Sequence, residues 1–84
     1  MTLQERVKKI FAEHNINYDC DYNCNAQQVI ITIINGDWKH DHCFLQNVME
    51  QNDFVCVDKY ITASDCDCYD GEYTFQLLRS ESIN

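Results

Sequence analysis

The sequence predicts an α+β fold in which two helices lie on one face of a four-stranded antiparallel sheet, in the order α-β-β-α-β-β. Apolar residues recur at helical spacing in two segments, and they alternate or form β-branched runs in four others. The length of 84 residues fits a single domain, residues 1–84, with a thin core. Residues 80–84 are polar and are expected to be a frayed tail.

The first helix is expected to begin next to the N-terminus. Thr2 and Glu5 have the spacing of a capping box, in which each side chain accepts a hydrogen bond from the other residue's backbone amide. An apolar stripe follows at helical spacing, formed by Leu3, Val7, Ile10, Phe11 and His14. Asn15 then suits the left-handed position that ends a helix.

Two strands are expected to follow this helix. Residues 18–24 alternate strictly, which predicts a half-buried strand whose outer face carries Asp19, Asp21 and Asn23. Residues 29–34 form a β-branched run that is apolar on both sides, as is typical of a central strand. The pair Asn35-Gly36 is typical of a turn and is expected to end this strand.

The second half of the chain is expected to form a helix and two more strands. Asp41 can cap a helix that runs to about Asn52, with a buried stripe of Phe44, Leu45, Val48 and Met49. Residues 54–62 are β-branched and aromatic, which favours a strand. The acidic residues 64–71 predict a loop, and residues 72–79 predict the last strand, with Tyr73, Phe75 and Leu77 on one face.

The charge of the chain is acidic and unevenly placed. The formal net charge is −8, and three of the six basic residues lie within the first nine positions. From Ile10 onward, thirteen carboxylates face three bases, a net charge of −10. The densest acidic segment contains Asp65, Asp67, Asp70 and Glu72. Such a field disfavours direct binding to nucleic acid and favours a basic protein partner.

The chain shows no apolar signal core and no membrane-spanning run, so we expect a cytoplasmic protein without contact to membranes. In a reducing compartment the six cysteines are expected to be thiols: Cys20, Cys24, Cys43, Cys56, Cys66 and Cys68. A zinc site built from Cys66 and Cys68 with His40, His42 and Cys43 is the alternative. The Cys-x-Cys spacing is tighter than that of the usual zinc knuckle, which favours thiols acting as small hydrophobic side chains.

Other chemistry has little support in the sequence. Asp65, Asp67 and Asp70 depart from a calcium-binding loop, because Asp70 stands where glycine is needed and Gln76 stands where glutamate is needed. Cys43 follows His42 directly, and neighbouring side chains point apart on a helix or strand, which argues against a catalytic pair. The sequence therefore predicts a protein that is not an enzyme and holds no cofactor or metal.

The only tryptophan, Trp38, lies among polar and charged residues after the Asn35-Gly36 pair. In that position its side chain is either a lid over the edge of the core or an exposed anchor for a partner. A thin core needs covering side chains, which favours the lid.

In size, charge, lack of an export signal and α+β make-up, the whole chain resembles the small acidic anti-defence proteins of phages and mobile elements, including anti-CRISPR and anti-restriction proteins. Some members of that group are DNA mimics that fill the nucleic-acid groove of a nuclease or effector complex. The resemblance implies a non-enzymatic inhibitor whose phosphate surrogates are Asp65, Asp67, Asp70 and Glu72, with Asp19 and Asp21 as a second row. Two alternatives remain: the zinc module, and a general acidic interaction domain that binds through an aromatic patch around Trp38.

Overall fold

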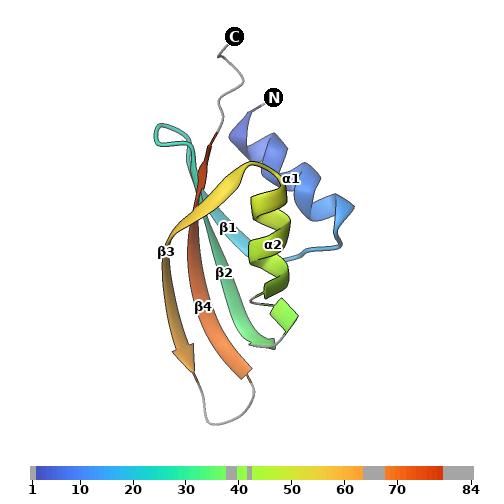
Figure 1. Ribbon diagram of the computed structural model, residues 1–84, viewed down its shortest axis with the longest axis vertical. Helices are drawn as coiled ribbons and strands as arrows, with labels where there is room; N and C mark the ends of the chain where they lie inside the picture. The colour runs from blue at the N-terminus through green and yellow to red at the C-terminus, as the bar shows by residue number, and fades with distance from the viewer. Residues whose placement is uncertain (1, 38–39, 42, 64–67, 79–84) are drawn as a thin grey trace.

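The computed structural model of the chain describes residues 2–37, 40–41, 43–63 and 68–78 (Figure 1). The elements, in chain order, are α1 (Leu3–Glu13), β1 (Asp19–Asn23), β2 (Gln28–Asp37), α2 (Cys43–Gln51), β3 (Phe54–Ala63) and β4 (Cys68–Leu77). The strands form one antiparallel sheet in the order β1-β2-β4-β3. The predicted α+β fold, its element order and its four-stranded antiparallel sheet are therefore confirmed.

Both helices lie on the same side of the sheet, and the core fills the space between the two layers (Figure 1). Each helix contributes three buried residues at helical spacing: Leu3, Val7 and Ile10 from α1, and Leu45, Val48 and Met49 from α2. The sheet contributes the inward residues of β2, β3 and β4: Val29, Ile31, Ile33, Phe54, Tyr69, Tyr73, Phe75 and Leu77. The opposite side of the sheet is covered by neither helix.

Helix α1 begins and ends as the sequence predicts. The Thr2 side chain accepts a hydrogen bond from the Glu5 amide at 3.1 Å, and the Glu5 carboxylate accepts one from the Thr2 amide at 2.9 Å. This reciprocal pair satisfies backbone amides that have no partner within the helix. Asn15 adopts the left-handed conformation, with φ of 55°, just beyond the end of the helix.

The prediction that Asn35-Gly36 forms a turn is wrong, because β2 continues to Asp37. The register between β2 and β4 shifts between Ile33 and Gly36, and Asn35 has a φ of 56°. A single left-handed residue within a paired strand produces a bulge, which bends the strand without reversing it. Gly36 is buried at this point, and an added Cβ would lie 2.4 Å from Cγ2 of Ile33.

The prediction of a loop over residues 64–71 is wrong for its second half, because β4 begins at Cys68. The inward positions of β4 are Tyr69, Gly71, Tyr73, Phe75 and Leu77, all of them buried. A Cβ added at Gly71 would lie 2.9 Å from the rings of Tyr69 and Tyr73, so only glycine fits between them. That glycine hides the alternation in the sequence. At its other end β4 ends at Leu77, two residues earlier than expected.

Asp41 does not act as the predicted helix cap, because α2 begins at Cys43 and the carboxylate has other partners. Asp41 accepts hydrogen bonds of 2.7 Å from the Tyr18 hydroxyl and from the Asp37 amide. Burial alone would raise the pKa of Asp41, but these bonds and the neighbouring His40 together hold that pKa below its ordinary value. The carboxylate thus ties the end of β2 to the residue that precedes β1.

Candidate functional site

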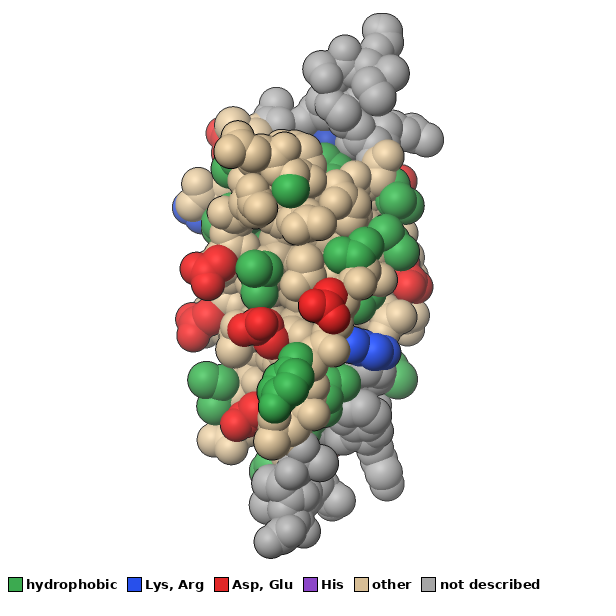
Figure 2. All heavy atoms as spheres, turned by 90° about the vertical axis from the view of Figure 1, so that its left-hand side faces the viewer, with side chains coloured by type: hydrophobic (Ala, Val, Ile, Leu, Met, Phe, Trp, Pro, Cys, Tyr) green, Lys and Arg blue, Asp and Glu red, His purple; other side chains and the backbone are tan. Residues whose placement is uncertain are grey.

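Besides Asp37 at the end of β2, the uncovered side of the sheet carries five exposed carboxylates, which we call the acidic face: Asp19, Asp21, Asp58, Asp70 and Glu72. Figure 2 shows this side of the molecule, with acidic side chains spread over its middle and along one margin. The strands place them there because residues alternate between the two sides of a sheet, and the residues between these acids point into the core.

The register of the sheet arranges the acidic face in rows that cross all four strands. Residues directly opposite each other on neighbouring antiparallel strands share one side of the sheet. One row contains Asp19, Thr32, Glu72 and Tyr60, and the next contains Asp21, Ile30, Thr74 and Asp58. Each row therefore holds one carboxylate on the edge strand β1 and a second one on β4 or β3.

The described strands contain a single base, Lys59, and it lies on the other side of the sheet. Its register partner is Tyr73, which is fully buried under the helices. Arg6, Lys8 and Lys9 belong to α1, in the helix layer. Within the described part of the chain, none of the five carboxylates forms an ion pair. The described bases thus all lie away from the acidic face.

The acidic face contains four of the carboxylates that the sequence proposed as partner-binding residues. Asp70 and Glu72 lie on β4, and Asp19 and Asp21 lie two strands away on β1. The other three proposed residues, Asp65, Asp67 and Trp38, lie outside the described residues.

The sequence reasoning missed Asp58, which adds a fifth carboxylate. The available signal is the alternation of Asp58, Tyr60 and Thr62, which are all exposed on β3. A register shift between Cys56 and Asp58 interrupts this alternation, so the strand lacks a regular pattern along its whole length.

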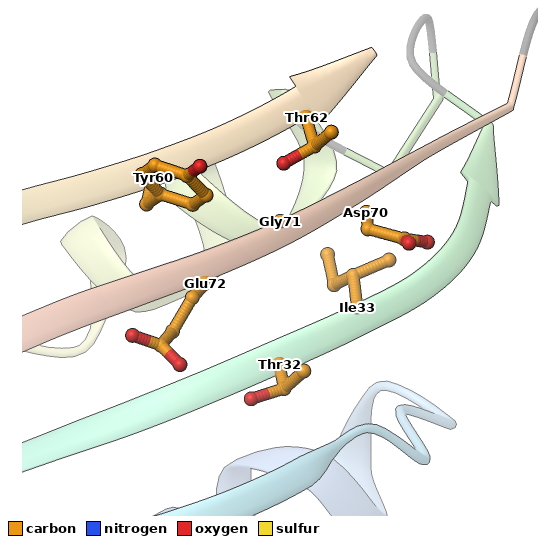
Figure 3. Close-up of a pocket in the computed structure, with 7 residues that line it drawn as sticks. All are labelled: Thr32, Ile33, Tyr60, Thr62, Asp70, Gly71 and Glu72. Carbon is orange, nitrogen blue, oxygen red and sulfur yellow. The ribbon is translucent and has the colours of Figure 1, made fainter. Parts of the chain in front are cut away.

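A shallow hollow of about 150 Å³ opens on the acidic face (Figure 3). Its lining residues come from β2, β3 and β4: Thr32, Ile33, Tyr60, Thr62, Asp70, Gly71 and Glu72. Pockets for drug-sized ligands span roughly 300–1,000 Å³, so this hollow suits a smaller group such as one side chain. One carboxylate oxygen of Asp70 accepts a hydrogen bond of 3.0 Å from the Asn35 amide, which fixes that side chain at the rim.

The cysteines of the described residues are free thiols, and they are spread over the molecule. Cys20 and Cys56 are half-buried, whereas Cys24, Cys43 and Cys68 are exposed. Burial raises the pKa of the Cys20 thiol to about 11, so this thiol stays protonated at neutral pH. No three cysteine, histidine or acidic side chains of the described residues lie close enough together to hold a metal ion. Cys66 and His42, which the zinc alternative uses, lie outside these residues.

In the portion of the chain that the structure describes, neither helix has the length and apolar character needed to cross a membrane. No protein-family model, curated protein or solved structure matches this chain.

Proposed function

We propose that this protein is a non-enzymatic inhibitor that binds a basic, nucleic-acid-binding protein through its acidic face. The partner is a nuclease or effector complex of a host-defence system, as for anti-CRISPR or anti-restriction proteins. The observation that supports this function is the acidic face itself, where five carboxylates share one side of a four-stranded sheet and no described base lies on that side.

The spacing of these carboxylates suits contact with a partner surface that normally binds nucleic acid. Residues two apart on one strand, such as Asp19 and Asp21, are separated by about 6.7 Å. The axial rise of B-DNA is about 3.4 Å per nucleotide, so the separation of such a pair is of the same order as the spacing of phosphates in a DNA strand. A groove lined with Lys and Arg would meet acidic groups in place of phosphates, and the opposite fields would also speed association.

The sheet adds rigidity to this surface. Four of the five acids lie on β1 and β4, strands whose backbones are held by hydrogen bonds to β2. Carboxylates fixed on a folded strand lose little backbone entropy when they bind, whereas those on a flexible tail would have to be ordered first. The acidic face should therefore bind at a lower entropic cost than a disordered acidic tail would.

The test begins with capture of partners from the native host at about 0.05 M and about 0.5 M salt, since exposed charges are screened at the higher concentration. A captured protein is then purified and titrated with the inhibitor in the presence of a fluorescent DNA that it binds. We expect competition with the DNA and an affinity that falls about tenfold or more at the higher salt concentration. Binding that DNA does not affect would contradict the proposal.

A matched pair of variants distinguishes the effect of the acidic face on affinity from the effect of net charge. The face variant carries Asp19→Asn, Asp21→Asn and Glu72→Gln, and the control variant carries Glu13→Gln, Glu50→Gln and Asp53→Asn. Both variants lose three negative charges, but the control acids are exposed on α1, on α2 and in the turn that follows α2. We expect the face variant to lose about tenfold or more in affinity and the control to lose much less. Equal losses would show that only the total charge matters.

A further inference from the structure

We propose that the hollow on the acidic face receives one arginine side chain of the partner protein, so that a guanidinium group sits between Asp70, Glu72 and the ring of Tyr60. This inference rests on the proposed function and specifies which part of the acidic face selects its partner.

The shape of the hollow fits an extended side chain with a flat, charged end. Its centre is the registered pair Ile33 and Gly71, and Figure 3 shows Tyr60 and Thr62 on β3 along one side of that pair. Asp70 and Glu72 stand on either side of Gly71 along β4. The lining is mainly apolar, which suits the methylene stem of a long basic side chain, while the charge lies at the rim.

The bulge in β2 helps to form this hollow. Glu72 has a register partner on both neighbouring strands, Thr32 and Tyr60. Asp70 is paired with Thr62 on β3 but has no register partner on β2, because the register shifts between Ile33 and Gly36. The strand instead presents the Asn35 amide, which holds the Asp70 carboxylate in place.

The groups around the hollow favour arginine over lysine. A guanidinium is planar, has five N–H donors and is only weakly hydrated, so it can bind two carboxylates and lie against an aromatic ring at once. Tyr60 is 72% exposed, so its ring is open to such a contact. An ammonium group is compact and strongly hydrated, so it gains less from the ring and from a second carboxylate.

The first experiment titrates the isotope-labelled protein with three capped tripeptides that have arginine, lysine or citrulline between two glycines. Citrulline has nearly the shape of arginine but no charge. We expect the arginine peptide to shift the backbone amide signals of Thr62, Gly71 and Glu72 and to bind about fivefold more tightly than the lysine peptide, with no saturable shift from citrulline. Equal binding of arginine and lysine, or shifts confined to other parts of the sheet, would overturn the proposal.

The second experiment repeats the arginine titration with four variants. Tyr60→Ala and Glu72→Gln are expected to weaken binding by about threefold or more, whereas Tyr60→Phe keeps the ring and binds like the natural chain. The matched control is Asp21→Asn, which removes one charge from the same face outside the hollow. A dispersed amide spectrum shows that each variant is folded.

The outcomes distinguish this inference from the proposed function. Equal weakening by Glu72→Gln and Asp21→Asn, with no effect of Tyr60→Ala, would leave a general acidic field: the inference would fail and the inhibitor function would stand. If the basic partner bound independently of all acidic-face variants, both would fail.

Discussion

The two sides of this sheet share one backbone but differ in side-chain chemistry and in exposure to solvent. One side carries apolar and tyrosine side chains and lies under two helices, and the other carries the acidic face and is open to solvent. Because strand residues alternate, an acid of the open side can lie next to residues of the core, as Glu72 lies between Gly71 and Tyr73. The covered side can therefore hold the fold while residues of the open side are free to vary.

The largest expected effect is a loss of stability on substitution of a core residue of β4, compared with its neighbour on the open side. Phe75 is fully buried, and Phe75→Ala is expected to cost about 3–5 kcal/mol, because it removes apolar contacts and leaves a cavity. Thr74 lies on the open side, and Thr74→Ala is expected to cost less than about 1 kcal/mol. Urea unfolding of both variants measures the difference. Similar losses would show that the open side contributes to the core.

An intermediate effect concerns Asp41, whose carboxylate accepts hydrogen bonds from Tyr18 and from the Asp37 amide. Asp41→Asn replaces one acceptor oxygen with an amide donor, so one of the bonds from Tyr18 and Asp37 is lost, at a cost of about 1 kcal/mol. The pKa of Asp41 is lowered in the folded protein, so its contribution is present at neutral pH and is lost as the pH falls through that lowered value.

Urea unfolding at several pH values tests this dependence on Asp41. The difference between the natural chain and Asp41→Asn should be constant near neutral pH and should shrink below about pH 4. Glu13→Gln, at an exposed position of α1, provides the control and should leave the unfolding free energy nearly unchanged. A difference that persists undiminished in acid would contradict the role of the ionised carboxylate.

The smallest expected effect comes from the acidic face itself. Its variant with Asp19→Asn, Asp21→Asn and Glu72→Gln should fold as stably as the natural chain, or more stably by less than about 1 kcal/mol, because mutual repulsion is relieved. Added salt should remove any gain, because these side chains are exposed. A loss above about 2 kcal/mol in urea unfolding would mean that the acids support the fold and are not held in reserve for a partner.

The sequence predicts the helices and strands well, but it predicts the bulge in β2 and the start of β4 poorly. Apolar periodicity identifies both helices and all four strands, and the capping box places the start of α1. The bulge at Asn35 and Gly36 was missed, because the same two residues make turns in other contexts. The first residues of β4 were missed because Gly71, which two tyrosine rings require, interrupts the pattern by which strands are recognised.

The acidic face was only partly predictable for a different reason. Local alternation identifies Asp19 and Asp21 as neighbours on one side of β1. Their relation to Glu72 and Asp58 depends on β2 pairing with β4 rather than with β3, a contact between distant parts of the chain. Periodicity within one strand carries no information on which strands lie side by side, so the rows appear only in the folded sheet.

The outer edge of β3 has a consequence for the behaviour of the protein in solution. A strand of ten residues at the border of a sheet offers backbone groups to which another chain can attach, the first step toward fibrous aggregates. Here the register shift after Cys56 bends that border, and the exposed Lys59 would have to lose water on contact with a neighbour. Both features oppose edge-to-edge growth of the sheet, and they leave the acidic face exposed at high concentrations of the chain.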